Sequence, residues 1–226
     1  MKMLNDNRIR IIVGHYGSGK TEFAVNYAVK LAKLGKKVTL ADLDVVNPYF
    51  RSREKEEELE RLGIKVLGSS IKGGAVDVPS VSAEVYGPLQ DNSVEAILDV
   101  GGDPAGARAL GRYYSYFEEG KYDMLFVVNA NRPETQTLDN VLKYIREIEG
   151  ASRVRVTGLI NNTHLLKSTT VEDVLGGQKL IEEVSDFLNI PIKYVSALEH
   201  VAKDLPHDIK GEIFPINLFM REDWMI

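Results

Sequence analysis

The chain alternates between short apolar segments and longer segments with helical spacing. The apolar segments are rich in β-branched residues, which is typical of buried strands, and they are Ile9–Val13, Lys37–Ala41, Ile64–Leu67, Ala96–Val100, Met124–Val128, Val154–Ile160 and Ile192–Val195. Helical spacing marks the segments between most of them, at Glu22–Leu34, Ser52–Leu62, Ala105–Glu119, Glu134–Glu149 and Val171–Leu188. Strands that alternate with helices predict a three-layer α/β fold with a mainly parallel sheet flanked by helices.

The whole chain, residues 1–226, is expected to form a single domain. No internal repeat, low-complexity tract or Pro/Gly-rich linker divides it. Its least regular part is Ser69–Ser93. A lid, a partner surface and a long surface connection all remain open for that part.

Composition narrows the classes of protein that need to be considered. With 44% hydrophobic and 27% charged residues, the chain resembles ordinary globular proteins. It contains no apolar stretch of the roughly 18–20 residues that a membrane helix needs and no secretory signal, so we expect no membrane segment and a cytoplasmic location. The net charge of −5 argues against nucleic-acid binding by the chain itself. The absence of cysteine excludes disulfides, thiolate metal sites and cysteine nucleophiles.

A glycine-rich segment lies between the first predicted strand and the first predicted helix. Its sequence, GHYGSGKT from Gly14 to Thr21, fits the Walker A pattern of a phosphate-binding loop. The glycines let the backbone wrap around a phosphate chain, Lys20 is expected to bridge the β- and γ-phosphates, and the Thr21 hydroxyl to coordinate Mg²⁺. The nucleotide contacts predicted here are Gly14, His15, Tyr16, Gly17, Ser18, Gly19, Lys20, Thr21 and Glu22.

Carboxylates follow two other predicted strands. Asp42 and Asp44 come after the second strand, and alternation along an extended chain puts them on one side. We expect Asp44 to orient the attacking water and Asp42 to join the metal shell, and the reverse assignment is equally compatible with the sequence. Asp99 belongs to an apolar strand in the Walker B arrangement, in which the carboxylate holds magnesium directly or through water. The predicted catalytic residues are Lys20, Asp44 and Asp42, and the predicted metal ligands are Thr21, Asp42 and Asp99.

Gly102 follows Asp99 at a spacing that suits a phosphate sensor. Its backbone N–H is predicted to sense the γ-phosphate and to move when that phosphate leaves. The alternative for Gly101-Gly102 is an ordinary turn, and a turn can also act as a switch.

Asparagines follow two further predicted strands. Asn162 lies in Asn161–His164, and its amide is predicted to pair with the edge of a purine. A guanine reader of the usual kind has an Asn/Thr-Lys-x-Asp arrangement, and this segment lacks the Lys and the Asp, so ATP is favoured over GTP. The rival segment Asn129–Pro133 is interpreted as a cap for a helix that begins near Glu134.

Two charged features near the paired aspartates are given no chemical role. Arg51 and Arg53 are expected to form surface salt bridges, and the alternative is that one of them supplies transition-state charge as an arginine finger. The run Glu54–Arg61 is interpreted as the solvated face of a helix.

The combination of these motifs resembles a known group of proteins. The N-terminal Walker A loop, Asp42-Leu43-Asp44, Asp99-x-x-Gly102 and Asn162 are similar to the pattern of the MinD, ParA and CobQ/CobB group of P-loop NTPases, in the signal-recognition and MinD class. The resemblance extends over Arg8 to Leu198. It implies that Asp42 and Asp44 form one switch, that Asp99 and Gly102 form a second, and that Asn162 contacts adenine. Most members dimerise around ATP, so the resemblance also implies a homodimer or a regulated protein partner.

The chain departs from the MinD and ParA subgroup at one position of the loop. That subgroup has an early lysine that reaches the partner's nucleotide, and His15 stands there in this chain. Histidine is shorter and mostly neutral at pH 7, so the same bridge is not expected. The C-terminal segment Ile213–Phe219 is interrupted by proline and does not form the amphipathic basic helix of MinD.

The sequence thus predicts a Mg²⁺-dependent ATPase whose hydrolysis of ATP changes switch segments that regulate a partner protein. One alternative is a small-molecule kinase or ATP-dependent ligase with an acceptor pocket in Ser69–Gln90. Another is a nucleotide-dependent binding module that turns over slowly. Phosphate release in the absence of an acceptor separates these possibilities.

Overall fold

The fold is built on one parallel sheet. A computed structural model describes residues 2–44, 55–68 and 83–220 of the chain. The described strands form an eight-stranded sheet in the order β3-β2-β4-β1-β5-β6-β7-β8, and every pairing is parallel. The strands are β1 (Ile9–Gly14), β2 (Lys37–Leu43), β3 (Ile64–Leu67), β4 (Val94–Val100), β5 (Tyr122–Val128), β6 (Gly158–Asn161), β7 (Ile192–Leu198) and β8 (Glu212–Ile216). The predicted α/β class is confirmed.

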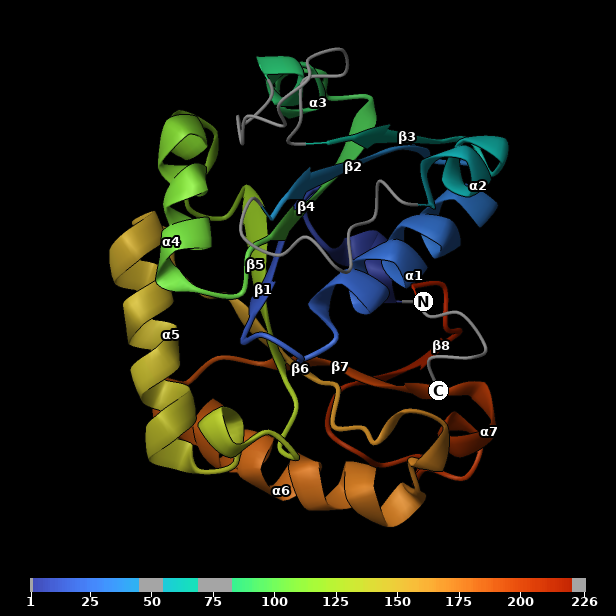
Figure 1. The fold of residues 1–226 in the computed structure, drawn as a ribbon, viewed down its shortest axis with the longest axis vertical. Coiled ribbons are helices and arrows are strands. Elements are labelled where there is room, and N and C mark those ends of the chain that lie inside the picture. The colour runs from blue at the N-terminus through green and yellow to red at the C-terminus, as the bar shows by residue number, and fades with distance from the viewer. Residues whose placement is uncertain (1, 45–54, 69–82, 221–226) are drawn as a thin grey trace, which may run out of the picture.

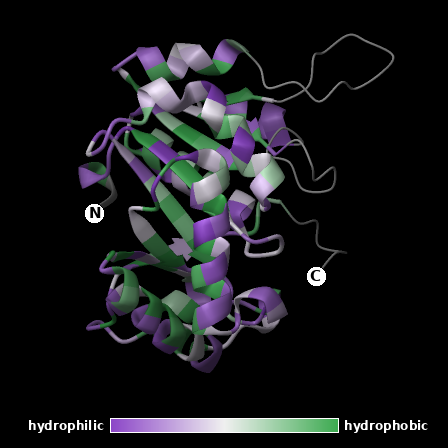
Figure 2. Cartoon of the chain, turned by 90° about the vertical axis from the view of Figure 1, so that its left-hand side faces the viewer, coloured by the Kyte–Doolittle hydropathy of each residue, from purple (hydrophilic) through white to green (hydrophobic). Residues whose placement is uncertain are grey.

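Helices cover both faces of the sheet (Figure 1). On one face, α1 (Lys20–Lys33) and α2 (Glu56–Arg61) join the apolar cluster that includes Phe23 and Leu59. On the other face, α5 (Leu138–Ser152) and α6 (Val171–Leu188) pack with α3 (Tyr86–Gln90) and α4 (Pro104–Ala107), while α7 (Glu199–Ala202) packs beside β7. Figure 2 shows the hydrophobic strands inside and mixed helix surfaces outside. Within the described ranges, no helix combines the length and apolar character needed to cross a membrane.

The order of the strands places a crevice at the end of β1. The chain moves from β1 to β2 on one side and later enters β5 on the other side, so β1 lies between β4 and β5. Every residue of β1 and of β5 is buried, as expected for central strands covered on both faces. In sheets of this kind ligands bind beyond the carboxyl ends of the strands, where the order reverses.

Three predicted elements differ from the observed ones. The strand expected over Val154–Ile160 is regular only from Gly158. The helix expected over Ala105–Glu119 divides into α4 and a 3-10 helix, Arg108–Tyr116, because Gly106 and Gly111 weaken the α-helical preference. The helix expected from Glu134 begins at Leu138, where the Thr137 side chain caps it, and Pro133–Thr135 forms a separate 3-10 turn.

The strand β8 was not predicted, because Pro215 interrupts its apolar run. β8 lies at the edge of the sheet and pairs with β7 alone. Proline has no backbone N–H to donate to a neighbouring strand. An edge strand tolerates this loss because it has a neighbour on one side only. β8 therefore extends the sheet beside β7, and residues 217–220 continue from its end toward the crevice.

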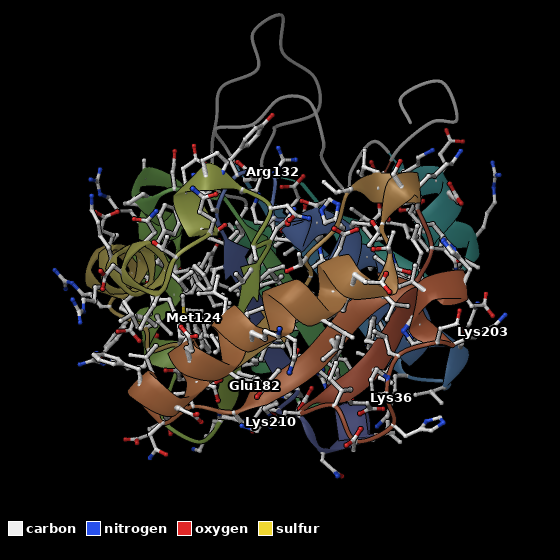
Figure 3. The ribbon with its side chains drawn as sticks, turned by 90° about the horizontal axis from the view of Figure 1, so that it is seen from below. Lys36, Met124, Arg132, Glu182, Lys203 and Lys210 are labelled. Carbon is white, nitrogen blue, oxygen red and sulfur yellow. The ribbon has the colours of Figure 1, made fainter. Side chains whose placement is uncertain are left out.

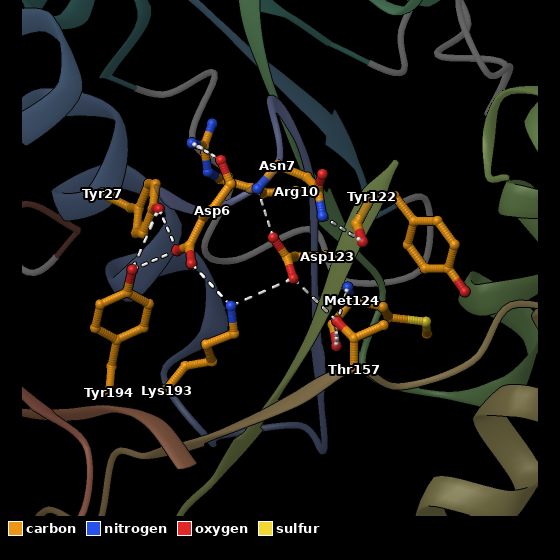
Figure 4. Close-up of polar contacts among 10 residues, drawn as sticks. All are labelled: Asp6, Asn7, Arg10, Tyr27, Tyr122, Asp123, Met124, Thr157, Lys193 and Tyr194. Carbon is orange, nitrogen blue, oxygen red and sulfur yellow. Dashed lines mark hydrogen bonds and ion pairs between the residues drawn. The ribbon is translucent and has the colours of Figure 1, made fainter. Parts of the chain in front are cut away.

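A buried polar cluster closes the opposite end of the sheet (Figure 4). Asp6 accepts hydrogen bonds from the hydroxyls of Tyr27 and Tyr194, and its carboxylate pairs with Lys193 Nζ at 2.9 Å. Lys193 also lies 3.5 Å from Asp123. Burial lowers the pKa of Lys193, but these carboxylates raise it overall. The cluster fastens the N-terminal segment to β5 and β7 and lies away from the crevice.

Candidate functional site

The glycine-rich loop crosses the end of β1 and leads directly into α1. Gly17 and Gly19 adopt φ angles of 77° and 81°, which side chains rarely tolerate. The backbone N–H groups of Gly17, Gly19, Lys20 and Thr21 make no hydrogen bond to the described chain. Free N–H groups at the start of a helix form a cradle for an anion. The geometry of the loop therefore suits a phosphate chain.

Two side chains hold the outer side of this loop. Arg132 Nε donates to the carbonyl oxygen of Gly17 at 3.2 Å, and Asn162 Nδ2 donates to the carbonyl oxygen of Ser18 at 2.7 Å. A Cβ added at Gly17 would lie 2.9 Å from Arg132 Nε, and one added at Gly19 would overlap the Asn162 amide. The glycines are thus needed for close approach as well as for their backbone angles.

The segments that carry Arg132 and Asn162 are joined to each other. Asn129 Oδ1 accepts from the backbone N–H of His164 at 3.3 Å, and Asn129 Nδ2 donates to the carbonyl oxygen of His164 at 3.4 Å. The Ala130 N–H donates to Thr163 Oγ1 at 3.2 Å. The side chain of Asn129 is therefore engaged in this scaffold.

The predicted carboxylates converge beside Lys20. Lys20 Nζ lies 3.4 Å from Asp44 Oδ2, and Asp42 Oδ1 accepts from the backbone N–H of Asp44 at 3.0 Å. Asp42 and Asp99 face each other in the register of β2 and β4, and all three carboxylates are buried. Burial raises the pKa of Asp99 to about 6, and Asp44 adds to that rise, whereas Lys20 and the Thr21 hydroxyl oppose it.

The donor set fits a hard divalent cation. Both carboxylate oxygens of Asp99 are buried without a hydrogen bond of ordinary geometry, and the Thr21 hydroxyl is close enough to lower the pKa of this group. No cluster of three acidic or histidine side chains in the described part of the chain can hold a metal by itself. Magnesium in phosphate sites takes much of its coordination from phosphate and water, so Thr21 and the carboxylates suffice.

Gly102 lies directly against the loop. A Cβ added there would lie 2.9 Å from Tyr16 N, 3.0 Å from Gly14 O and 3.2 Å from His15 C. The hydroxyl of Tyr144, on α5, donates to the Gly102 carbonyl, and the Tyr144 ring meets the His15 ring edge-on at 4.9 Å. Burial and nearby carboxylates raise the pKa of Tyr144 to about 12, so its hydroxyl remains a donor at neutral pH.

A cavity of about 280 Å³ extends from the loop across the ends of β6, β7 and β8. Its walls include Tyr16, Arg132 and Asn162 at one side and Ser196–Leu198 at the end of β7. Leu218 and Met220 contribute from the segment after β8. The cavity is mostly apolar with a few polar groups near the loop, as is usual for small-molecule sites. Figure 3 shows Arg132 at this end of the molecule and Lys210 at the other.

Glu22 organises the wall after β8. Its carboxylate accepts from the backbone N–H of Phe219 at 2.6 Å and from that of Met220 at 3.1 Å. One turn later, Asn26 exchanges hydrogen bonds of 2.8 Å with the backbone of Asn217. The first turns of α1 therefore hold both the phosphate loop and the segment Asn217–Met220, which we call the C-terminal strap.

The structure brings together the predicted loop residues, the three aspartates, Gly102 and Asn162. Within this group, Tyr16 is 56% exposed and points its ring partly to solvent. The structure also adds Arg132, Tyr144, Ser196 and the strap, which sequence reasoning missed. Their only signal is position: Arg132 lies in the rival segment Asn129–Pro133 after β5, and Ser196 lies near the carboxyl end of β7. Arg51, Arg53 and most of Ser69–Gln90 lie outside the described residues.

Comparisons with known proteins agree with this geometry. The family model described as the CobQ/CobB/MinD/ParA nucleotide binding domain matches residues 9–203 of this chain. No curated protein matches the chain.

Solved structures with a similar fold include FtsY proteins from two organisms. FtsY from Thermotoga maritima is 24% identical with a TM-score of 0.58, over 86% of this chain and 63% of that one. Chloroplast FtsY from Physcomitrella patens is 22% identical with a TM-score of 0.58, over 89% and 62%. The signal recognition particle 54 kDa protein from Aeropyrum pernix, solved with GDP, is 19% identical with a TM-score of 0.52, over 83% and 40%. This chain spans less than two thirds of each of these structures, and the likeness is one of fold.

Proposed function

This chain belongs to the CobQ/CobB/MinD/ParA nucleotide-binding domain family, and we propose that it is a cytoplasmic, magnesium-dependent ATPase whose hydrolysis cycle resets switch segments that regulate a partner protein or a second copy of the chain. The observation that carries this proposal is the placement of Lys20, Asp44 and Asp99 around the open N–H groups of the loop. This arrangement supplies a cradle, a cation and carboxylates at one point, which phosphoryl transfer requires.

In this proposal each group has a distinct task. Lys20 leaves Asp44 to contact the β- and γ-phosphates, and Asp44 then orients the attacking water. Thr21 and Asp99 would hold the magnesium ion together with Asp42, which also positions Asp44 by accepting from its backbone N–H at 3.0 Å. Bound magnesium would neutralise charge on the phosphates. The Gly102 N–H follows the γ-phosphate as the second switch.

The chemistry of the cavity supports adenine as the base. Guanine presents ring and amino N–H donors that are usually met by a carboxylate. Among the described residues that line the cavity, Glu22 is the acidic one, and its carboxylate accepts from Phe219 and Met220. Asn162 offers an amide that suits adenine. GTP is the alternative, because the similar fold from Aeropyrum pernix was solved with GDP.

A slow nucleotide-dependent binding module is the second candidate. The 3.4 Å ion pair between Lys20 and Asp44 favours it, because the pair must separate before Lys20 can reach phosphate and Asp44 can reach water. A partner that favours the separated arrangement would then set the rate of hydrolysis.

Phosphate release from Mg²⁺–ATP by the purified chain tests the proposal, with ATP and GTP affinities measured by calorimetry. Lys20→Ala is expected to lower turnover at least 100-fold, whereas Lys179→Ala, on the exposed side of α6, should leave it unchanged. Tight ATP binding without turnover would favour the binding module or an acceptor-dependent kinase. Failure of the folded protein to bind either nucleotide would overturn the proposal, and tighter binding of GTP would overturn the assignment of Asn162 to adenine.

A further inference from the structure

Arg132 lies at the nucleotide cavity and has free hydrogen-bonding capacity. It lines the same cavity as Lys20 and Asn162, and its side chain is half-buried. The Nε bond to the Gly17 carbonyl is its one side-chain hydrogen bond within the described part of the chain. Its two terminal nitrogens are therefore available to a ligand.

The position of Arg132 is fixed before any ligand binds. Its backbone N–H donates to Asn129 O at 3.1 Å, its carbonyl accepts from Thr135 N at 2.9 Å, and Thr135 Oγ1 donates to Asn129 O at 2.7 Å. Pro133 follows and restricts the backbone further. A guanidinium on such a scaffold loses little conformational freedom on binding a ligand.

Arg132 and Asn162 contact consecutive carbonyl oxygens of the loop, and both side chains line the cavity. Arg132 bonds to the Gly17 carbonyl and Asn162 bonds to the next one, that of Ser18. Phosphate oxygens are attracted to the N–H groups of such a loop and repelled by its carbonyl oxygens. Arg132 therefore lies beside the path of the phosphates, next to the predicted base-binding residue.

The remainder of the cavity suits a flat aromatic ring. Its walls away from the loop are largely apolar and include Leu166, Ala197, Leu198, Ile216, Leu218 and Met220. A guanidinium stacks on aromatic faces, and the attraction strengthens where water is excluded. A phosphate group would gain little from these walls.

We propose that Arg132 binds the nucleoside part of the nucleotide, with its guanidinium lying against the face of the purine that Asn162 reads at its edge. This inference rests on the proposed function, because it requires a purine nucleotide in the cavity. It makes Arg132 a determinant of affinity for the base that is separate from Lys20, which serves the phosphates.

Calorimetric titration with phosphate ligands that carry or lack the nucleoside tests this inference. Mg²⁺–ATP, Mg²⁺–ADP and Mg²⁺–tripolyphosphate are titrated into wild type, Arg132→Ala, Arg132→Lys, Lys20→Ala and, as a matched control, Arg146→Ala on the exposed side of α5. Arg132→Ala is expected to weaken ATP and ADP about tenfold each and tripolyphosphate less than twofold. Arg132→Lys keeps the charge but not the planar group, so at least a threefold loss for ATP and ADP is expected.

The outcomes separate the two proposals. A similar loss of tripolyphosphate binding in Arg132→Ala would show that Arg132 acts on the phosphates, directly or through the loop that its Nε holds, and would overturn the inference. Unchanged ATP and ADP affinity would overturn it too, while leaving the proposed ATPase intact. If folded wild type binds tripolyphosphate but neither ATP nor ADP, both proposals fail. Lys20→Ala should lose affinity for all three ligands.

Discussion

The hydroxyl of Tyr144 donates a hydrogen bond to the carbonyl oxygen of Gly102, and the Tyr144 ring meets the ring of His15 edge-on. One side chain of α5 thus touches both the phosphate loop and the segment proposed to sense the γ-phosphate. Asp103 follows at once and caps α4 by accepting from Gly106 N at 2.6 Å. Movement of Gly102 would therefore change the contacts of both α4 and α5.

Tyr144→Phe removes this hydroxyl while keeping the ring. We expect kcat for ATP hydrolysis to fall about three- to tenfold with KM changed less than twofold, because the position of Gly102 is no longer fixed. The free energy of unfolding should fall by about 1 kcal/mol. Steady-state kinetics and denaturant unfolding measure the two effects. Tyr86→Phe removes a hydroxyl-to-carbonyl bond away from the site, so it should alter stability alone. Equal kcat effects in both variants would contradict a role for Tyr144 in positioning Gly102.

Asp99→Asn is predicted to stabilise the ligand-free protein at neutral pH. The folded pKa of Asp99 is about 6, above the ordinary value of 3.8, so ionisation of this group destabilises the fold. The stability that the protonated group contributes is fully present below pH 4 and is lost as the pH rises to 6, at a cost on the order of 3 kcal/mol. The asparagine variant avoids that loss, so its advantage in unfolding free energy should be absent at pH 4 and full at pH 7.

Magnesium should oppose the difference in stability between wild type and Asp99→Asn. Wild type with Mg²⁺–ADP should gain in melting temperature more than Asp99→Asn, because the metal stabilises the ionised carboxylate. A variant that is less stable than wild type at pH 7 without ligand would contradict the elevated pKa of Asp99.

Gly177→Ala is predicted to destabilise the fold and to displace Thr163, which supports the segment that carries Arg132. An added Cβ would overlap the Thr163 side chain, which accepts the Ala130 N–H beside Arg132. We expect a loss of about 1–3 kcal/mol in unfolding free energy and weaker nucleotide binding. Gly176→Ala, one residue earlier in α6, meets nothing within 4 Å and should stabilise by up to about 1 kcal/mol. Thermal unfolding of the pair measures the difference, and similar melting temperatures would refute the contact.

Glu22→Gln is predicted to release the C-terminal strap. The carboxylate accepts from two backbone N–H groups, whereas the amide has one oxygen and would direct an NH₂ group at the other donor. Amide hydrogen exchange at Phe219 and Met220 should accelerate at least tenfold, and ATP affinity should fall several-fold because Leu218 and Met220 line the cavity. Glu60→Gln, on exposed α2, should change neither quantity. Unchanged exchange at both amides would refute this role of Glu22.

Much of the fold follows from local patterns in the sequence. Apolar strands alternating with helices specify a parallel α/β sheet, and a glycine-rich loop between β1 and α1 specifies an anion cradle, because both depend on residues adjacent in the chain. The proximity of Asp42 and Asp99 could be predicted from the sequence, because the carboxyl ends of parallel strands share one edge of the sheet. The positions of β8 and of the true start of α5 were missed because Pro215 and the turn Pro133–Thr135 mislead a local interpretation.

The remaining parts of the site depend on contacts between distant residues. Arg132 is 115 residues from Gly17, and Met220 is 198 residues from Glu22. Nothing near Glu22 in the sequence indicates that its carboxylate will meet backbone N–H groups of the strap. The sequence by itself determined the phosphate loop and the strand-end carboxylates, whose chemistry is encoded locally. Only the tertiary structure decided which side chains complete the cavity, because the packing of the helices and the order of the strands fix those distances.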